Sequence, residues 1–219
     1  MTRKTKLPSF PKDYRDEKAI EYDSSKSMER NQKRSTLWSI QYLFDKKLDE
    51  ISSKPLIMED SFLILDLGCG TGFSSEILIE NGFKVVGIDI LEDMIFKARD
   101  KKNSIKEYKE IEYILADINF LPIKRNKIDH IISISSYNFI IHEMDNYGEK
   151  VKLLNDTAKN LHNILKENGR IVIEFYPKDE KELNIFNKSF INNGFEGFMV
   201  KKNPSQKAGQ TFLLLRKRS

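Results

Sequence analysis

Two acidic residues follow short apolar runs in the first half of the chain, and the first opens a glycine-rich turn. Segment 66–74 reads Asp-Leu-Gly-Cys-Gly-Thr-Gly-Phe-Ser. Its glycines would let the backbone approach a ligand, and a following helix would point its positive N-terminus at an anion. Asp89 follows Gly72 by 17 residues, where a carboxylate can accept both hydroxyls of a ribose. These residues predict a nucleotide-type ligand.

The spacing within the turn separates two kinds of nucleotide site. A dinucleotide fingerprint would need a glycine three residues after Gly70, but that position is Phe73. The pattern is instead Asp-x-Gly-x-Gly-x-Gly, which disfavours a pyrophosphate cofactor. Because a tight loop without a ligand also uses glycines, the turn taken alone leaves that structural role open.

The elements that must position these residues alternate along the chain. Short apolar runs, several of them separated by helical patterns, predict strands at 62–67, 84–89, 112–117, 128–135 and 170–175. Such alternation is typical of a doubly wound parallel sheet, which binds ligands outside the carboxyl ends of its strands. Two further strands near 196–200 and 211–216, joined by a loop with Pro and Gly, predict an antiparallel pair that closes the sheet.

Two helices are predicted from apolar positions that share one helical face. The first begins at Ser35 and is ended by Pro55, with its face formed by Leu37, Ile40, Phe44, Leu48 and Ile51. The second covers 151–165, and Gly169 is expected just past its end as the residue that terminates it.

Composition bounds the class of protein. The 219 residues suit one α/β domain, and the hydrophobic share of 39% is enough for a sizeable core. No run of about eighteen apolar residues occurs, and the N-terminus lacks the apolar stretch of a secretory signal, so we expect a cytoplasmic protein without a membrane span. One cysteine, Cys69, and three histidines exclude an internal disulfide and a cysteine-rich metal cage, so no metal site is expected.

Charge is distributed unevenly along the chain. Residues 1–54 carry 13 Lys and Arg against 9 Asp and Glu, residues 55–200 carry 18 against 24, and residues 201–219 carry 6 against none. Basic ends on an acidic body fit contacts with a polyanion such as RNA, although Lys-rich ends can also serve only to keep the termini solvated. We expect a basic arm at 1–12, an N-terminal helical extension at 13–54 and the core domain at 55–219.

The glycine turn, with the acids after the next two strands, resembles motif I and its partners in class I S-adenosylmethionine-dependent methyltransferases. The resemblance implies a Rossmann-like α/β fold: a mostly parallel seven-stranded sheet with an antiparallel last strand, helices on both faces and an N-terminal helical extension. It also implies the cofactor S-adenosyl-L-methionine, with the methionine end at Asp66 and the turn, the ribose at Asp89, and the adenine at Asp117 and Ile118. The implied cofactor-binding residues are Tyr22, Asp66, Gly68, Cys69, Gly70, Gly72, Asp89, Ile90, Asp117, Ile118 and Ser133. Cys69 fits a small filler of the loop rather than a nucleophile.

A narrower resemblance concerns the substrate. The segment 132–135, Ile-Ser-Ile-Ser, resembles the small-subunit (18S) ribosomal RNA (guanine-N7)-methyltransferase family, and similarity continues from about Asp16 to Leu215. It implies methylation of guanine N7, which has a free lone pair and loses no proton, so positioning matters more than a general base. Tyr137, Asn138 and Phe139 would line the base pocket, with an aromatic face stacking on the guanine and the amide reading its edge. Plain packing is the alternative for the two rings. The family has Gln-Trp where this chain has Asn138-Phe139, so we expect a difference in base recognition there.

Partners and alternatives complete the predictions. The resembled family works with ribosomal RNA or a small-subunit precursor, and with a small zinc-binding activator protein that docks on the edge strand carrying Ile111, Tyr113 and Leu115. The Lys-rich segment 101–109 could instead only protect that edge by charge. Two other functions stay open: a methyltransferase of the same fold that acts on a small metabolite or a protein, and a non-catalytic ribosome assembly factor.

Overall fold

The strands form one sheet in the computed structural model, which describes residues 9–51, 61–104, 108–142, 144–202 and 210–218. The sheet has seven strands in the order β3-β2-β1-β4-β5-β7-β6. They are β1 (Leu63–Leu67), β2 (Lys84–Asp89), β3 (Ile111–Leu115), β4 (Ile128–Ile134), β5 (Leu165–Phe175), β6 (Phe195–Lys201) and β7 (Thr211–Lys217).

Strand direction agrees with the predicted fold class. The first five strands pair in parallel, and β7 runs antiparallel between β5 and β6. The chain order reverses at β1, which lies between β2 and β4. A parallel sheet binds ligands outside the carboxyl ends of its strands at such a switch point, so the predicted site residues converge there.

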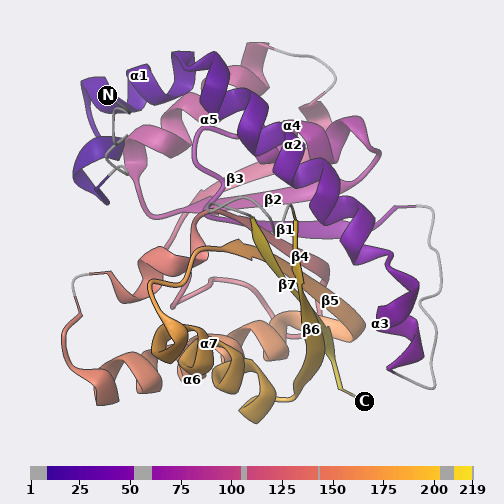
Figure 1. The fold of residues 1–219 in the computed structure, drawn as a ribbon. Helices are drawn as coiled ribbons and strands as arrows, with labels where there is room; N and C mark the ends of the chain where they lie inside the picture. The colour runs from indigo at the N-terminus through magenta and orange to yellow at the C-terminus, as the bar shows by residue number, and fades with distance from the viewer. Residues whose placement is uncertain (1–8, 52–60, 105–107, 143, 203–209, 219) are drawn as a thin grey trace.

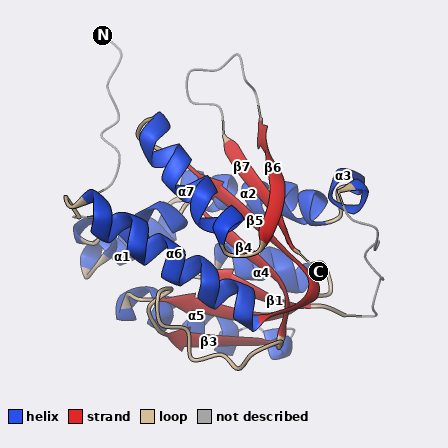
Figure 2. Cartoon of the chain, turned by 90° about the horizontal axis from the view of Figure 1, so that it is seen from below, coloured by secondary structure: helices blue, strands red, loops and turns tan. Residues whose placement is uncertain are grey.

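Helices cover both faces of the sheet (Figure 1; Figure 2). One apolar core lies between the sheet and α6 (Tyr147–Ile164) with α7 (Glu180–Asn192). The other lies under α2 (Lys26–Leu43), α3 (Lys46–Glu50), α4 (Phe73–Glu80) and α5 (Glu92–Ser104). The shorter elements are α1 (Glu17–Ser24) and the 3-10 turns η1 (Lys12–Tyr14), η2 (Tyr108–Glu110) and η3 (Tyr137–Ile141).

The prediction of one helix from Ser35 to Pro55 was wrong. The helix starts earlier, after Ser25, whose hydroxyl accepts the N–H of Met28, and the chain forms two helices with a break after Leu43. Asp45 caps the second helix by accepting the N–H of Lys47 at 2.9 Å. Leu37 and Ile51, which the single face would have buried, are 44% and 41% exposed.

A buried arginine accounts for the break. Arg170 in β5 is 2% exposed, and its guanidinium donates to the carbonyl of Leu43 at 2.6 Å and to the carboxylate of Asp49. A cation at the last carbonyl of α2 is favoured by the helix dipole. The second buried arginine, Arg216, pairs with Arg170 across β5 and β7 and donates to the carbonyl of Leu48 at 3.1 Å. The sheet therefore fixes both short helices through long-range contacts.

Gly169 does not terminate α6, contrary to the sequence prediction. The helix ends at Ile164, and β5 begins at the next residue, Leu165, which pairs with Ile128. The left-handed residue of this segment is Asn168, with φ of 65°. Gly169 lies inside β5, where a Cβ would come within 2.9 Å of the carbonyl oxygen of Lys166. The glycine is needed for close approach rather than for a helix cap.

No helix among the described residues is both long enough and apolar enough to cross a membrane. Residues 1–8 of the expected basic arm lie outside the described residues.

Candidate active site

The glycine-rich turn after β1 takes the conformation that its glycines allow. Gly68, Gly70 and Gly72 have φ values of 70°, 55° and 90°. The N–H of Gly68 donates to the carbonyl of Ile88 at 2.7 Å, which fixes the turn to the end of β2. A Cβ on Gly68 would meet that of Ser136 at 2.3 Å, whereas one on Gly70 would meet nothing within 4 Å. The turn therefore presents open backbone at Gly70, where a ligand can approach.

Asp66 lies beneath this turn with one oxygen bonded and one free. Its side chain is fully buried, and Oδ2 accepts the hydroxyls of Ser74 and Ser75, each at 2.6 Å. Oδ1 has no hydrogen-bond partner among the described residues. Burial raises the pKa of Asp66 to about 6, while the two serine hydroxyls act in the opposite direction. A buried, unpartnered carboxylate oxygen favours a donor such as an ammonium group.

Asp89 links the turn to the next helix. Its carboxylate accepts the N–H of Gly70 at 3.0 Å through Oδ2 and the N–H of Leu91 at 2.9 Å through Oδ1. Burial raises the pKa of Asp89, and these backbone donors partly offset the rise. Ile90 beside it is 50% exposed. Each carboxylate oxygen keeps a lone-pair site for a further donor such as a sugar hydroxyl.

Asp117 and Ile118 follow β3 on the same side of the sheet. Asp117 Oδ1 accepts the backbone N–H of Asn119 at 2.8 Å and its side-chain amide at 2.9 Å. Asn119 is fixed in turn by the hydroxyl of Thr157 on α6, at 2.5 Å. Ile118 is half-buried and packs against the core under α6 and α7. The structure therefore holds this acid in one orientation beyond the end of β3.

Ser133 supports the turn from behind. It is fully buried, and its hydroxyl donates to the carbonyl of Leu67 at 2.9 Å, as does that of Ser136 at 2.7 Å. The two serine oxygens lie 2.7 Å apart. Ser133 thus joins β4 to β1, and it contacts the turn rather than open space.

A row of aromatic rings runs from the turn to η3. Tyr22 stacks on Phe73 with ring centroids 6.1 Å apart and lies 5.6 Å from Tyr14. Phe10 stacks on Phe139 at 4.7 Å with an interplanar angle of 14°, and Tyr14 meets Phe139 edge-on at 5.8 Å. Burial, then the charges of Tyr14, Asp89, Asp23 and Asp66, raise the pKa of Tyr22. Tyr22 therefore lies near the carboxylates of the turn.

The three residues predicted to line a base pocket have different environments. Tyr137 is fully buried against Phe186 and Phe190, so the structure places it in the core. Asn138 is tied to the backbone of Tyr176, accepting its N–H at 2.9 Å and donating to its carbonyl at 3.0 Å. Phe139 is half-buried in the aromatic row.

One buried acid at the site was not singled out from the sequence. Glu174 is 1% exposed and accepts the hydroxyls of Ser35 and Tyr176 at 2.9 Å and that of Ser135 at 2.7 Å, and the amide of Gln210. It therefore joins α2, the residue that precedes β7, and the exits of β4 and β5. The sequence did offer a signal for it, because Glu174 is an acid inside the apolar run 170–175. A buried acid is rarely found without hydrogen-bond partners.

A family model described as "Methyltransferase domain" matches residues 59–208, more than half of the chain. The chain belongs to this methyltransferase family. Its predicted class I fold is thereby confirmed, together with the seven-stranded sheet.

Curated methyltransferases are similar over most of the chain. A protein named "18S rRNA (guanine-N(7))-methyltransferase" from Bos taurus is 30% identical over 152 residues, which cover 69% of this chain and 52% of that protein. One named "Probable 18S rRNA (guanine-N(7))-methyltransferase" from Dictyostelium discoideum is 27% identical over 198 residues, covering 90% and 66%. The chain thus spans about half to two thirds of the length of these relatives.

A solved methyltransferase shares the fold. Magnesium protoporphyrin IX methyltransferase from Synechocystis PCC 6803, solved with bound SAM, has a TM-score of 0.58 and 21% identity, covering 87% of this chain and 79% of that one. The cofactor of the present methyltransferase is S-adenosyl-L-methionine, and the residues around its glycine-rich turn fit this molecule. A free buried oxygen on Asp66 suits the amino group, and the open backbone at Gly70 admits the ligand.

Other groups in the methyltransferase have structural roles. Cys69 is 4% exposed, and burial raises its pKa well above the usual value for a thiol, so it is not a thiolate nucleophile at neutral pH. The described residues contain no cluster of three or more possible metal ligands. His130 is buried, and burial lowers its pKa to about 3, so it stays neutral.

The β3 edge of the sheet, where a partner protein was predicted to dock, differs in part from the prediction. β3 is an edge strand, as predicted from the fold, but the side chains of Ile111 and Tyr113 are buried, and only Leu115 is exposed, at 49%. The guanidinium of Arg99 donates to the carbonyl of Tyr113 at 2.8 Å. A partner at this edge would therefore meet backbone, Leu115 and the exposed Glu112 rather than all three predicted side chains.

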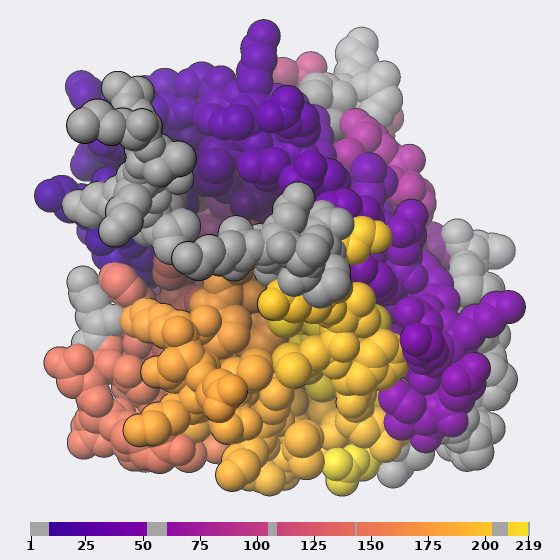
Figure 3. All heavy atoms as spheres, viewed as in Figure 1, coloured from indigo at the N-terminus to yellow at the C-terminus, as the bar shows by residue number. Residues whose placement is uncertain are grey.

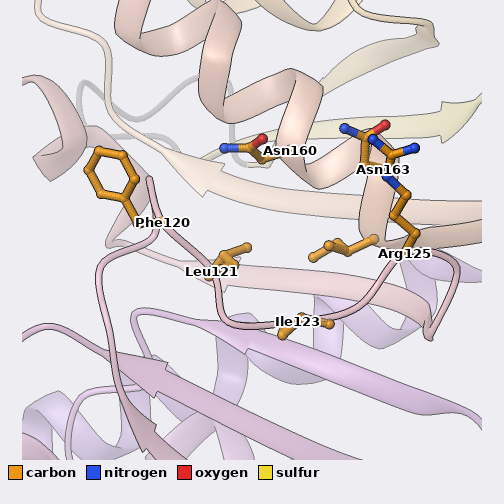
Figure 4. A pocket seen from close by; sticks show the side chains of 7 residues that line it. Phe120, Leu121, Ile123, Arg125, Asn160 and Asn163 are labelled. Atoms are coloured by element: carbon orange, nitrogen blue, oxygen red, sulfur yellow. The ribbon is translucent and has the colours of Figure 1, made fainter.

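A shallow depression lies between the loop 118–127 and the end of α6 (Figure 4). Figure 4 shows Arg125 and Asn163 beside one another at one end and Phe120 at the other. None of the predicted cofactor or substrate residues lines it.

Proposed function

We propose that the chain transfers the methyl group of S-adenosyl-L-methionine to guanine N7 of small-subunit ribosomal RNA. The observation that carries this proposal is the similarity to 18S rRNA (guanine-N7)-methyltransferases over as much as 90% of the chain. That length includes segments outside the cofactor half of the fold, where methyltransferases with other substrates differ most.

The described geometry supports a specific assignment of the cofactor. The ammonium of the methionine end binds the free oxygen of Asp66, and its carboxylate lies near the turn and the start of α4, where backbone N–H groups favour an anion. Asp89 binds the ribose hydroxyls, with Ile90 beside it. Asp117 and Ile118 hold the adenine, and Tyr22 covers the methionine end.

The chemistry requires no general base. The N7 lone pair forms a bond to the sulfonium methyl carbon while the carbon–sulfur bond breaks, so sulfur becomes a neutral thioether and the base gains the positive charge. Positioning in line and exclusion of water are the main requirements. Phe139 stacks on the base, since an aromatic face also stabilises a cationic ring.

Asn138 supports the base pocket indirectly in this proposal. Its two hydrogen bonds to Tyr176 join the exits of β4 and β5. Tyr137, within the core, supports η3 from below. The amide therefore positions the pocket wall, and it does not read the edge of the base.

The zinc-binding activator remains part of the proposal for the β3 edge. An edge strand invites strand addition where its backbone groups are not already bonded, and here Arg99 already bonds the carbonyl of Tyr113. The exposed Leu115 at the end of the strand adds apolar contact. Co-purification of the two proteins, weakened by Leu115→Asp and unaffected by Leu37→Asp on α2, is the expected result. Equal binding by both variants would place the partner elsewhere.

One observation favours the second candidate, a methyltransferase that acts on a small metabolite or a protein. Phe10 covers one face of Phe139, the ring proposed to stack on the base, which leaves less open ring surface for an RNA base. The two candidates share every cofactor residue and differ in what binds beside Phe139.

Labelled transfer separates the candidates. The protein is incubated with methyl-labelled S-adenosylmethionine and unmodified small ribosomal subunits, with and without the activator, and the RNA is digested to nucleosides. Label in 7-methylguanosine supports the proposal. Confirmed cofactor binding without label in RNA in either arm would contradict it and favour the second candidate.

A further inference from the structure

The exposed face of α2 carries a row of basic side chains. Lys26, Arg30 and Arg34 are spaced by four residues, so they lie along one side of the helix, and all three are exposed. The opposite side of α2 is buried and includes Ser35, Thr36, Ser39 and Leu43. Figure 3 shows the indigo and purple surface of the N-terminal helices beside the yellow C-terminal strands.

These basic groups differ from the other cations of the same region in having no acidic partner. Lys33 on α2 pairs with Glu29 and with Glu76, each at 2.8 Å, and Lys101 pairs with Asp23 at 2.5 Å. Among the described residues, no ion pair joins an acid to Lys26, Arg30 or Arg34, and Arg34 bonds only to the neutral amide of Asn31, at 3.2 Å. Within the described part of the chain, three positive charges therefore lie along one helix face without an acidic partner.

An aromatic ring continues the row. Trp38 is half-buried one turn after Arg34, whose Cζ lies 5.2 Å from the centre of its ring. From the end of β6, Lys202 places its Nζ 5.0 Å from the same ring. A partly open indole flanked by two cations combines a stacking surface with phosphate-binding charge, which is how proteins hold single-stranded nucleic acid.

The helix that carries the basic row packs, through its buried side, next to the proposed active site. Ser35, which follows Arg34 in the chain, donates to Glu174, and the same carboxylate accepts Ser135 at the exit of β4. One buried carboxylate therefore separates the helix from the segment that leads into η3. A strand of RNA whose base enters beside Phe139 can continue along α2.

We propose that Lys26, Arg30, Arg34, Trp38 and Lys202 form a track, the α2 track, that binds single-stranded RNA flanking the methylated base. The inference rests on the proposed function, because it names the surface that holds the substrate of that site. The three exposed charges of α2 contact phosphates, and a base stacks on Trp38 in place of one of the two cations that lie over its ring.

The test compares two triple variants of equal charge. Lys26→Gln/Arg30→Gln/Arg34→Gln removes the α2 charges, and Lys152→Gln/Lys159→Gln/Lys188→Gln removes three exposed charges from α6 and α7 on the other face of the sheet. Affinity for a single-stranded RNA that carries the target sequence is measured by fluorescence anisotropy over a range of salt. Cofactor affinity, measured by calorimetry, verifies that both variants are folded.

The α2 variant should bind RNA about a hundredfold more weakly near 0.1 M salt and lower the salt slope by about 2, since each phosphate contact on a single strand contributes about 0.7. The control variant should keep the wild-type slope. Trp38 is the sole tryptophan of the chain, so quenching of intrinsic fluorescence by RNA reports on the track without any substitution.

Each other outcome has a definite meaning. Three results would overturn the track: an unchanged salt slope in the α2 variant, an equal loss of RNA affinity in both variants, or RNA binding without tryptophan quenching. If the wild-type protein still methylates RNA, the proposed function stands in each of these cases. A wild type that binds the cofactor but neither binds nor methylates RNA would overturn the proposed function, and the track with it.

Discussion

Phe10 and Phe139 stack nearly face to face, with ring centroids 4.7 Å apart and an interplanar angle of 14°. The first belongs to the segment before η1 and the second to η3, so the N-terminal segment lies over the exit of β4. Stacking on Phe139 is the contact proposed for the target base, and Phe10 covers one face of that ring. In this proposal a base that stacks on the covered face has to displace Phe10.

Removal of the Phe10 ring should strengthen RNA binding. An aromatic pair contributes about 0.5–1.5 kcal/mol beyond burial, so Phe10→Ala should lower KM for RNA by about twofold to tenfold with little change in kcat. Phe10→Tyr keeps the stack and should resemble the wild type. A higher KM in Phe10→Ala would mean that Phe10 forms part of the base site.

Cofactor affinity should depend on pH through Asp66. Its folded pKa is about 6, against about 3.9 in an unfolded chain, so the acid holds its proton over a wider range when folded. The ammonium of the cofactor requires the charged form, so affinity should rise with pH through about 6. The free energy of unfolding without cofactor should show the opposite trend. It should fall as pH rises from about 4 to 6 and stay level above that.

Asp66→Asn provides the control for that profile. It keeps an acceptor for Ser74 and Ser75 but cannot ionise, so calorimetric titrations from pH 5 to 7.5 should show weaker binding and a flatter profile. Any remaining slope belongs to Asp89, whose pKa is also raised. A wild-type affinity that is level across this range would contradict the role of Asp66.

Asp89→Ala should abolish useful cofactor binding. The substitution removes the proposed ribose contacts and frees two backbone N–H groups of Gly70 and Leu91, so affinity should fall by about a hundredfold or more. Asp100→Ala removes an exposed carboxylate from α5 and should bind normally. Normal calorimetric affinity in Asp89→Ala would contradict the cofactor assignment.

The buried arginine of β5 should matter for stability. Arg170→Leu leaves the carbonyl of Leu43 and the carboxylate of Asp49 without this donor, so unfolding free energy should fall by about 3–5 kcal/mol in denaturant titrations. Arg125→Leu, at an exposed position, should change it by less than about 0.5 kcal/mol. A small effect at Arg170 would mean that apolar packing alone holds α2 and α3.

The sheet, and the convergence of three acids at its carboxyl edge, could be predicted from sequence because both depend on local signals. Apolar runs and their ends fix which residues lie at the carboxyl edge, and parallel strands bring Asp66, Asp89 and Asp117 to the same edge. Glycine spacing then restricts the kind of turn. These features need no knowledge of distant contacts.

The surroundings of η3, where the proposed substrate binds, could not be predicted in the same way. Whether Tyr137 or Phe139 is buried depends on the direction of η3, a short 3-10 turn without a periodic pattern. Similarly, the break between α2 and α3 depends on Arg170, which is far away in the sequence. Long-range contacts of this kind override helical periodicity.

The central claim is tested most directly by mapping 7-methylguanine in the RNA product. Small ribosomal subunits lacking the modification are treated with wild type or Asp89→Ala in the presence of S-adenosylmethionine, and the extracted RNA is reduced and cleaved with aniline, which breaks the chain at 7-methylguanine. The proposal predicts one new cleavage site with the wild type and none with the variant. Intact RNA after treatment with a wild type that binds the cofactor would contradict it.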